Sequence, residues 1–175
     1  MASTFKTGQG ISFGILDYGS PQIIAARFKD GALRATDMME PLSMIALDMM
    51  EVEKKVFSSG GRRGGGSWKQ LAPSTVAKKG STAILRHTEE LYESLTEPGA
   101  PHQILDMTRY SFAFGTDRPW SFVHQYGSEN MHVPTRPFIK FIQSDYERWD
   151  QIIIDYLLKP FYNGKSPVKS VIEDG

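Results

Sequence analysis

The chain contains no cysteine. This absence excludes disulfide bonds, thiolate nucleophiles and zinc sites that are built on cysteine. The four histidines are scattered and show no His-x-x-x-His spacing, so the sequence predicts neither a metal site nor a cofactor. There is also no apolar run of about 18 residues and no basic-then-apolar segment at the N-terminus. We therefore expect a soluble protein that makes no membrane contact and stays in the compartment where it is made.

The chain also lacks the common catalytic motifs. It has no Gly-x-Ser-x-Gly sequence and no His-Glu-x-x-His sequence, and the glycine run before Ser67-Trp68 is not followed by the Lys-Ser/Thr pair of a phosphate-binding loop. A hydrolase that uses His124 would rest only on the position of this histidine beside Gln125. A hydrogen-bonded pair that fixes the local fold is the preferred interpretation of these two residues. The sequence predicts no catalytic residue and a protein that is not an enzyme.

The charged residues are balanced in number but not in position. The 20 basic and 20 acidic residues give zero net charge, yet the segment from Lys54 through Thr88 has eight basic residues and no acidic one. The other 12 basic residues share the remaining sequence with all 20 acidic ones. Such segregation suits contact with a polyanion or with an acidic neighbouring subunit, and it is equally compatible with a solvated basic loop.

The most regular pattern is a helix that starts near Met38. Met38, Leu42, Ile45, Met49, Val52 and Val56 recur at spacings of four and three, which places all six on one helical face. Before it, residues 1–9 are expected to form a flexible arm, and the alternation over 11–15 is weakly typical of a strand. Ser20-Pro21 resembles a helix start, which predicts a short helix to about Phe28, although a second strand fits nearly as well.

The glycine-rich segment 58–67 is predicted to be a long flexible loop. It contains five glycines in ten residues, which makes ordering costly in conformational entropy. Its two arginines, with three lysines that follow, are the candidate contacts to a neighbouring subunit or to DNA: Arg62, Arg63, Lys69, Lys78 and Lys79.

The second half of the chain alternates short strands and helices. Thr88 is a plausible N-cap of a helix through about Leu95. Segments 103–107 and 110–115 are predicted to be two short strands, the second of which alternates aromatic and small residues. Ser144-Asp-Tyr-Glu147 resembles a capping box that opens a last helix, which ends before Pro160. Trp149, Ile152 and Ile154 widen its apolar face and are the candidate inter-subunit interface.

Together these patterns predict an α+β fold. In it a small antiparallel sheet packs with one long helix and one C-terminal helix. One domain over 1–160 and a C-terminal tail over 161–175 are expected.

A dense aromatic and proline-rich stretch stands out at 119–127 and 133–138. Two X-Pro steps hold the backbone extended and remove donors, while aromatic and polar side chains alternate, so we predict a rigid, non-helical corner that packs against the core. Its residues and their expected core partners are Trp68, Leu71, His124, Gln125, Tyr126, Gly127, Pro134, Arg136, Pro137 and Phe138.

His124-Gln125-Tyr126-Gly127 followed by Pro134-x-Arg136-Pro137-Phe138 resembles the phage virion morphogenesis family, the tail-completion and neck proteins of Mu-like tailed phages. Further matches occur upstream in the same order, and the resemblance covers roughly 38–149: Phe57, Trp68-x-x-Leu71, Ser74-Thr75, Ile84-Leu85, Thr88-x-x-Leu91-x-x-Ser94 and Phe114-Gly115-Thr116. One departure is Glu89, which stands where the family usually has glycine.

The resemblance implies a structural virion protein of the head–tail junction, made in the host cytoplasm. Such a subunit would form a homo-oligomeric ring, six-fold like the family's tail partners. It would contact head–tail connector and tail tube proteins and touch genomic DNA transiently. The alternatives are a tail terminator ring or a nucleic-acid-binding protein without sequence specificity, although zero net charge and the lack of a known binding module disfavour the latter.

Overall fold

A computed structural model describes residues 2–3, 15–16, 20–64 and 66–162. The chain divides into two compact units, whereas the sequence predicted one domain over 1–160. The first unit comprises Met1–Thr36 with Ile154–Gly175, and the second comprises Asp37–Ile153. Residues 163–175 of the predicted tail and most of the predicted N-terminal arm lie outside the described residues, as do residues 11–14 of the predicted strand.

The first unit is built around helix α1, Pro21–Arg34. Pro21 occupies its first turn, as predicted, but the helix runs further than Phe28. The ring of Phe28 meets that of Phe161 edge-on at 5.0 Å, and Arg34 lies over the ring of Tyr156. Phe161 belongs to the 3₁₀ helix η2, Lys159–Phe161, which follows the last helix. The same unit contains two strands of two residues each, β1, Ala2–Ser3, and β2, Ile15–Leu16, which pair antiparallel. None of residues 20–36 and 154–162 is buried.

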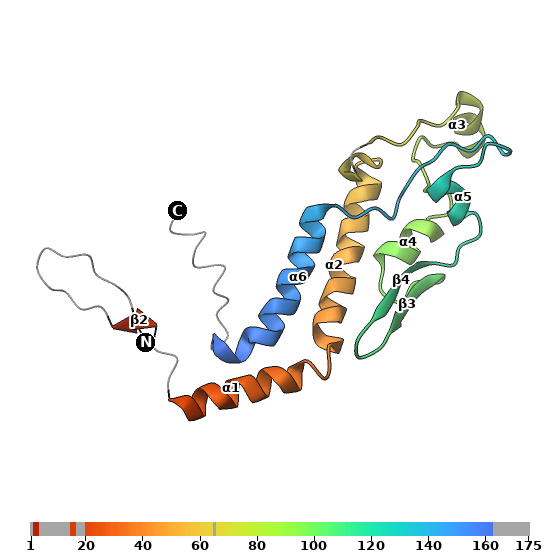
Figure 1. Ribbon diagram of the computed structural model, residues 1–175. Coiled ribbons are helices and arrows are strands. Elements are labelled where there is room, and N and C mark those ends of the chain that lie inside the picture. The colour runs from red at the N-terminus through yellow and green to blue at the C-terminus, as the bar shows by residue number, and fades with distance from the viewer. Residues whose placement is uncertain (1, 4–14, 17–19, 65, 163–175) are drawn as a thin grey trace, which may run out of the picture. The chain divides into compact units, whose positions relative to one another are not determined.

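The second unit is organised on helix α2, Met39–Ser58, which confirms the predicted long helix (Figure 1). The first part of helix α6, Gln143–Leu158, lies along it. Here Trp149 of α6 packs against Leu42 and Ile45 of α2, and its indole N–H donates to Asp48 at 2.7 Å. The helix pair is therefore tied by both apolar and polar contacts.

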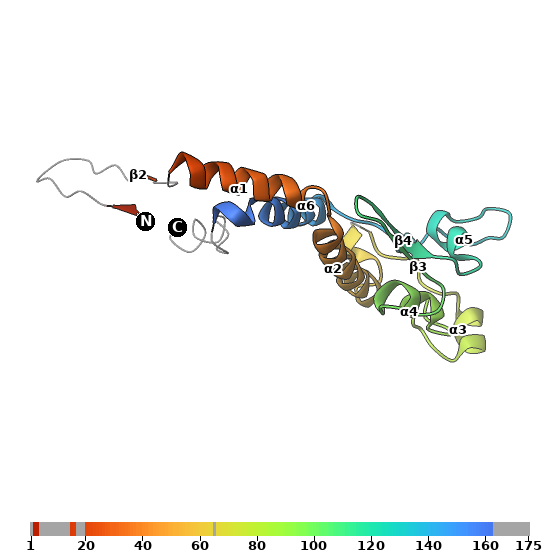
Figure 2. The same ribbon diagram turned by 90° about the horizontal axis from the view of Figure 1, so that it is seen from below.

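A β-hairpin and a short helix complete the α+β fold of the second unit. Strands β3, Gln103–Met107, and β4, Phe112–Thr116, pair antiparallel, at or near the predicted positions. Helix α4, Glu90–Thr96, packs against both the hairpin and α2 (Figure 2). Its preceding residue, Glu89, has φ of +61°, the left-handed conformation that glycine adopts most easily.

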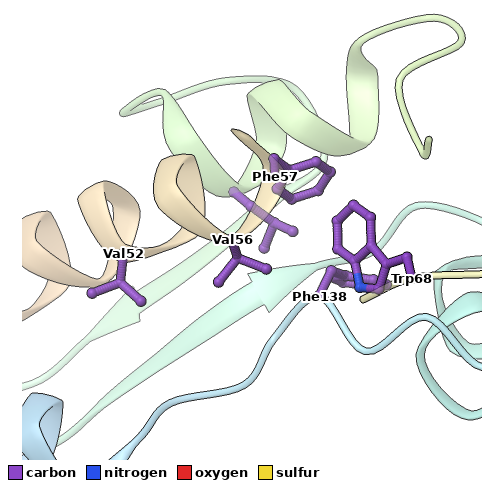
Figure 3. Close-up of a cluster of buried hydrophobic side chains, with 6 residues drawn as sticks. Val52, Val56, Phe57, Trp68 and Phe138 are labelled. Carbon is purple, nitrogen blue, oxygen red and sulfur yellow. The ribbon is translucent and has the colours of Figure 1, made fainter. Parts of the chain in front are cut away.

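The principal core lies between the C-terminal end of α2, α4 and the segment after residue 66. It comprises Val52, Val56, Phe57, Trp68, Leu95 and Phe138. Figure 3 shows Phe57 pointing at Trp68 with Phe138 beside them, and the first two rings meet edge-on at 5.4 Å. Each edge-to-face pair of this kind adds about 0.5–1.5 kcal/mol beyond burial.

Two local predictions are wrong. The corner was expected to be non-helical, but Ser121–Tyr126 forms helix α5, while 133–138 is irregular as expected. The capping box at Ser144 is also absent: α6 begins one residue earlier, at Gln143, and the Asp145 carboxylate accepts from the Ile142 N–H at 3.0 Å.

No helix in the described ranges is long and apolar enough to cross a membrane.

Candidate functional site

Gln125 holds the corner together. Its side-chain oxygen accepts from the N–H groups of Phe138 and Ile139, at 3.0 and 3.2 Å, and its amide nitrogen donates to the Ile139 carbonyl at 2.9 Å. Short helix α5 supplies this side chain, and the proline-bounded segment supplies the backbone groups. Because three bonds join the two segments, Gln125 acts as a backbone bracket, in agreement with the predicted structural role.

Trp68 links the glycine-rich segment to the same corner. Its side chain is buried, and its indole N–H donates to the Pro137 carbonyl at 2.9 Å. Gly61 lies directly against this ring, since a Cβ built there would stand 2.4 Å from two indole atoms, and its φ is +82°. Gly61 of the predicted loop is therefore required by its packing against Trp68 and by its positive φ.

Gly127 ends α5 in a conformation that other residues rarely adopt. Its φ is +79° and its ψ 171°, and an added Cβ would lie 2.6 Å from the Thr135 hydroxyl. That hydroxyl donates to the Tyr126 carbonyl, and Ser128 pairs with Val133 as an isolated bridge. The chain therefore reverses tightly between α5 and the Pro134–Phe138 segment.

A hollow of about 360 Å³, named the Arg136 hollow, lies beside this corner. Its lining comprises Leu71, Thr75, Lys78, Lys79, Leu85, His87, His124 and Arg136. Lys78 and Lys79 come from helix α3, Pro73–Lys79. The lining contains three cationic side chains and two histidines but no carboxylate, so it favours negative charge.

Arg136 is the buried charge of the hollow. It is 6% exposed, its Nε donates to the Lys69 carbonyl at 3.0 Å, and burial lowers its pKa. It forms no ion pair with any residue in the described ranges. Burial, and then the nearby Arg136 charge, also lower the pKa of His124, whose buried Nδ1 has no hydrogen-bond partner in the same ranges. Of the predicted hydrogen-bonded pair, Gln125 therefore has hydrogen-bond partners for its side chain, whereas His124 Nδ1 has none among the described residues.

A second hollow of about 290 Å³, named the Trp120 hollow, adjoins the first. The two share Leu85, His87 and His124 as lining residues. At its other side the second hollow is lined by Trp120, whose side chain is 63% exposed and whose φ is +70°. The shared wall makes the two hollows neighbouring parts of one surface depression.

A charge network lies apart from these hollows, at the start of α6. Asp145 is fully buried and pairs with Arg63 and Arg148, and Arg148 also pairs with Asp48. Burial raises the pKa of Asp145, but the bonds from Arg63, the Ile142 N–H and Arg148 outweigh it and hold the pKa at about 2. The network fixes the start of α6 to the glycine-rich segment and to α2.

Glu53 is a buried acid that sequence analysis missed. Both its carboxyl oxygens are buried without a hydrogen-bond partner among the described residues, and burial raises its pKa to about 8. It was missed because Val52 and Val56 define the apolar stripe without it. Its spacing of four from Met49 and three from Val56 places it on the same side of the helix, which is the signal that could have found it.

The predicted contact residues do not come together. Arg63 pairs inside the molecule with Asp145 in segment Arg62–Gly64, a short 3₁₀ helix, and so is not free for a partner. Arg62, Lys69 and Lys78 are exposed, and Lys78 and Lys79 line the Arg136 hollow together. The sequence does not distinguish Arg62 from Arg63. Only Arg63 pairs with Asp145, and that residue lies 82 positions further along the chain.

The predicted interface on the last helix is also corrected. Trp149 is buried and Ile152 is half-buried against the α2 cluster, which leaves Ile154, 46% exposed, as the one fully exposed member of that set. Tyr126, predicted to pack structurally, is 66% exposed. The remaining corner residues Leu71, Pro134, Pro137 and Phe138 are half-buried or buried.

Exposed aromatic side chains gather instead on and before α5. Trp120, Phe122 and Tyr126 are each more than 60% exposed, and the rings of the last two lie 4.8 Å apart. Phe122 and Tyr126 are spaced by four, the helical contact distance that could have indicated α5 from sequence. This group is named the α5 aromatic surface.

Within the described ranges, no group of three or more histidine or acidic side chains is placed to hold a metal ion. The arrangement offers binding surfaces, namely a cationic hollow and an exposed aromatic helix, both mounted on a rigid corner. Comparison with protein-family models, with curated proteins and with solved structures finds no match to this chain.

Proposed function

We propose that this chain is a structural subunit of a phage head–tail junction, a tail-completion or neck ring protein that joins or completes tails. The observation that carries the proposal is the convergence of the motifs that resemble the virion morphogenesis family. Trp68 bonds Pro137, Gln125 brackets Phe138, and Arg136 bonds the Lys69 carbonyl, so motifs far apart in sequence form one corner.

The turn before α4 adds support. The family usually has glycine at the position of Glu89, and Glu89 adopts a left-handed φ of +61° that glycine would reach without strain. Although the residue here is glutamate, its backbone adopts the conformation that glycine would favour at this position. The Glu89 carboxylate accepts a hydrogen bond from Arg86 Nε at 2.6 Å. This contact favours the left-handed conformation, which costs glutamate more free energy than it would cost glycine.

Surfaces left exposed on the chain suit a subunit that completes its packing on assembly. The α5 aromatic surface presents three large rings to solvent, and aromatic residues are enriched at protein interfaces. In the first unit, Ile23, Phe28 and Leu33 of α1 are 48–64% exposed.

Exposed cations support a further, transient contact with the genome. Lys55, Lys69 and Lys78 are exposed and form no ion pair with other described residues. Contacts of this kind bind phosphates loosely and without reading bases. No catalytic role is proposed for the corner, whose side chains chiefly bond backbone groups.

The proposal is tested by deleting the gene from the genome that encodes it and viewing the lysate by electron microscopy. We expect DNA-filled heads beside detached tails, and joined particles after complementation with the wild-type gene. A complementing Phe122→Ser variant should restore fewer joined particles, while Tyr110→Ser, a change at an exposed aromatic of the hairpin turn, serves as control. Normal joined particles from the deletion would contradict the proposal.

A further inference from the structure

The Arg136 hollow contains a buried positive charge that no described acid neutralises. Arg136 is 6% exposed, and its side chain donates one hydrogen bond, to the Lys69 carbonyl, without an ion pair among the described residues. A buried charge without a partner is strongly unfavourable. Because Arg136 lines an open hollow, an external anion can supply the missing charge.

The other lining residues of the hollow indicate which further groups a ligand would need. Lys78 and Lys79 add positive charge from α3, whereas Leu71 and Leu85 are apolar. Burial lowers the pKa of Lys79, and the nearby Glu89 carboxylate partly opposes this effect. A ligand that fills the hollow therefore has an anionic group attached to an apolar body, which a free inorganic ion does not have.

The adjoining Trp120 hollow lengthens the depression that starts at Arg136. The two hollows share Leu85, His87 and His124, and together they lead from the cationic α3 wall to an exposed indole. Trp120 holds a strained left-handed φ of +70° at this end, a conformation rare for bulky residues. The Arg136 hollow carries three cations on a mostly apolar wall, and the Trp120 hollow contains one cation, Arg118, which pairs with Glu90, beside the apolar Leu91 and Trp120.

We propose that these two hollows together bind an extended peptide segment of a partner protein, with a carboxylate at the Arg136 end and an apolar side chain at the Trp120 end. Charge complementarity and the apolar walls favour a peptide over a nucleic acid. Phosphates would be held by exposed cations, whereas this cation lies at the base of a largely apolar hollow. If the partner is an adjoining junction protein, that identity rests on the proposed function, but the ligand chemistry does not.

The test uses the full chain and two blocked hexapeptides, one that alternates leucine with glutamate and one with glutamine in place of glutamate. Binding is followed by NMR from the Arg136 Nε–H and the His87 and His124 ring signals. We expect the glutamate peptide to shift these signals at millimolar concentration and the glutamine peptide to bind roughly tenfold more weakly, as loss of a charge-assisted contact implies.

Substitutions separate this site from general attraction. The double change Lys78→Ala with Lys79→Ala should weaken the glutamate peptide roughly three- to tenfold, since rim charges contribute modestly. Lys55→Ala, which removes an exposed lysine outside both hollows, should leave binding unchanged.

Three results would each overturn the proposal: absence of shifts with the glutamate peptide, equal binding of both peptides, or tighter binding of inorganic phosphate or a short duplex DNA at the same signals. These measurements do not depend on ring formation. A chain that binds the peptide but joins no particles would contradict the proposed function alone, and the reverse would contradict this inference alone.

Discussion

At Gly127 the requirement for glycine is both conformational and steric. An alanine there would adopt φ of +79° with ψ of 171°, and its Cβ would meet the Thr135 hydroxyl at 2.6 Å. Gly99 has a similar φ of +74° but nothing within 4 Å of an added Cβ. Gly127 therefore combines a backbone conformation that essentially only glycine adopts with a steric collision, whereas Gly99 shows a positive φ without a collision.

We predict that Gly99→Ala lowers the free energy of unfolding by about 1–2 kcal/mol, the cost of left-handed geometry. Gly127→Ala should cost about 1–3 kcal/mol more, because the surroundings of the corner must shift. Urea denaturation of the two variants measures both values. Equal losses would show that the α5 reversal is open enough to accept a methyl group.

The second residue-scale prediction concerns Glu53 and pH. Burial raises its pKa from 4.5 to about 8, so the folded state keeps a proton that the unfolded state releases above pH 4.5. Stability from this group is therefore complete below pH 4.5 and falls as pH rises toward 8, by up to about 1.4 kcal/mol per pH unit. Asp145 acts oppositely, because its lowered pKa makes stability fall only as pH drops from 3.8 toward 2.

Glu53→Gln should flatten the pH dependence of Tm between pH 5 and 8, since glutamine does not ionise. Glu51→Gln is the matched control on the same helix. Glu51 is exposed and pairs with Lys54, so its substitution should leave the slope unchanged. An unchanged slope in Glu53→Gln would mean that water or movement solvates the buried carboxylate.

Arg62 and Arg63 provide a third prediction. Arg63 is bonded to buried Asp145, whereas the exposed Arg62 bonds only the Ser59 carbonyl among described groups. Arg63→Ser should lower the unfolding free energy by about 1–3 kcal/mol, as Asp145 keeps only Arg148 and one N–H. Arg62→Ser should stay within about 0.5 kcal/mol. Thermal denaturation in parallel checks both, and equal effects would place the ion pair in doubt.

At the scale of elements, the sequence predicted those that carry strong periodicity. The stripe from Met38 to Val56 predicted helix α2, and the alternation over 110–115 predicted a strand close to β4, Phe112–Thr116. The strand predicted over 103–107 matches the bounds of β3. Helix α5 was missed because six residues hold fewer than two turns, and its aromatic and β-branched residues have low helix propensity. The hollows could not be predicted at all, because their walls come from α3, α4, α5 and four separate irregular stretches.

Helix α5 carries the element-scale prediction. Phe122 and Tyr126 are exposed and contact each other, so replacing both with serine should change the unfolding free energy by less than about 1 kcal/mol. The same double variant should lose self-association or junction binding, because exposed aromatic pairs act as interface anchors. Sedimentation velocity measures association and circular dichroism the fold. Intact association in the double variant would assign the interface to another surface.

At the scale of the whole molecule, the predicted single domain became two units because distant segments pack together. Phe28 meets Phe161, and an added Cβ at Gly31 would lie 3.3 Å from the Leu157 carbonyl, so α1 associates with the end of α6. Sequence periodicity does not report such a pairing, since the partners are more than 120 residues apart. Residues 20–36 and 154–162 of the first unit include no buried residue, so this described part of the unit has no core of its own.

The last prediction follows from this incomplete packing. A small unit with exposed Phe28 and Leu33 gains stability when a neighbouring copy covers it, and a head-to-tail contact repeated around an axis closes into a ring. We expect a closed ring, six-fold as in the proposed junction, in native mass spectrometry of the protein alone or with its adjoining junction protein. Phe28→Ser with Leu33→Ser should shift the spectrum to monomers, whereas Tyr110→Ser should not. A protein that stays monomeric with its partner present, or closes as a two-fold dimer, would contradict the ring, because a dimer cannot continue the symmetry of a tail.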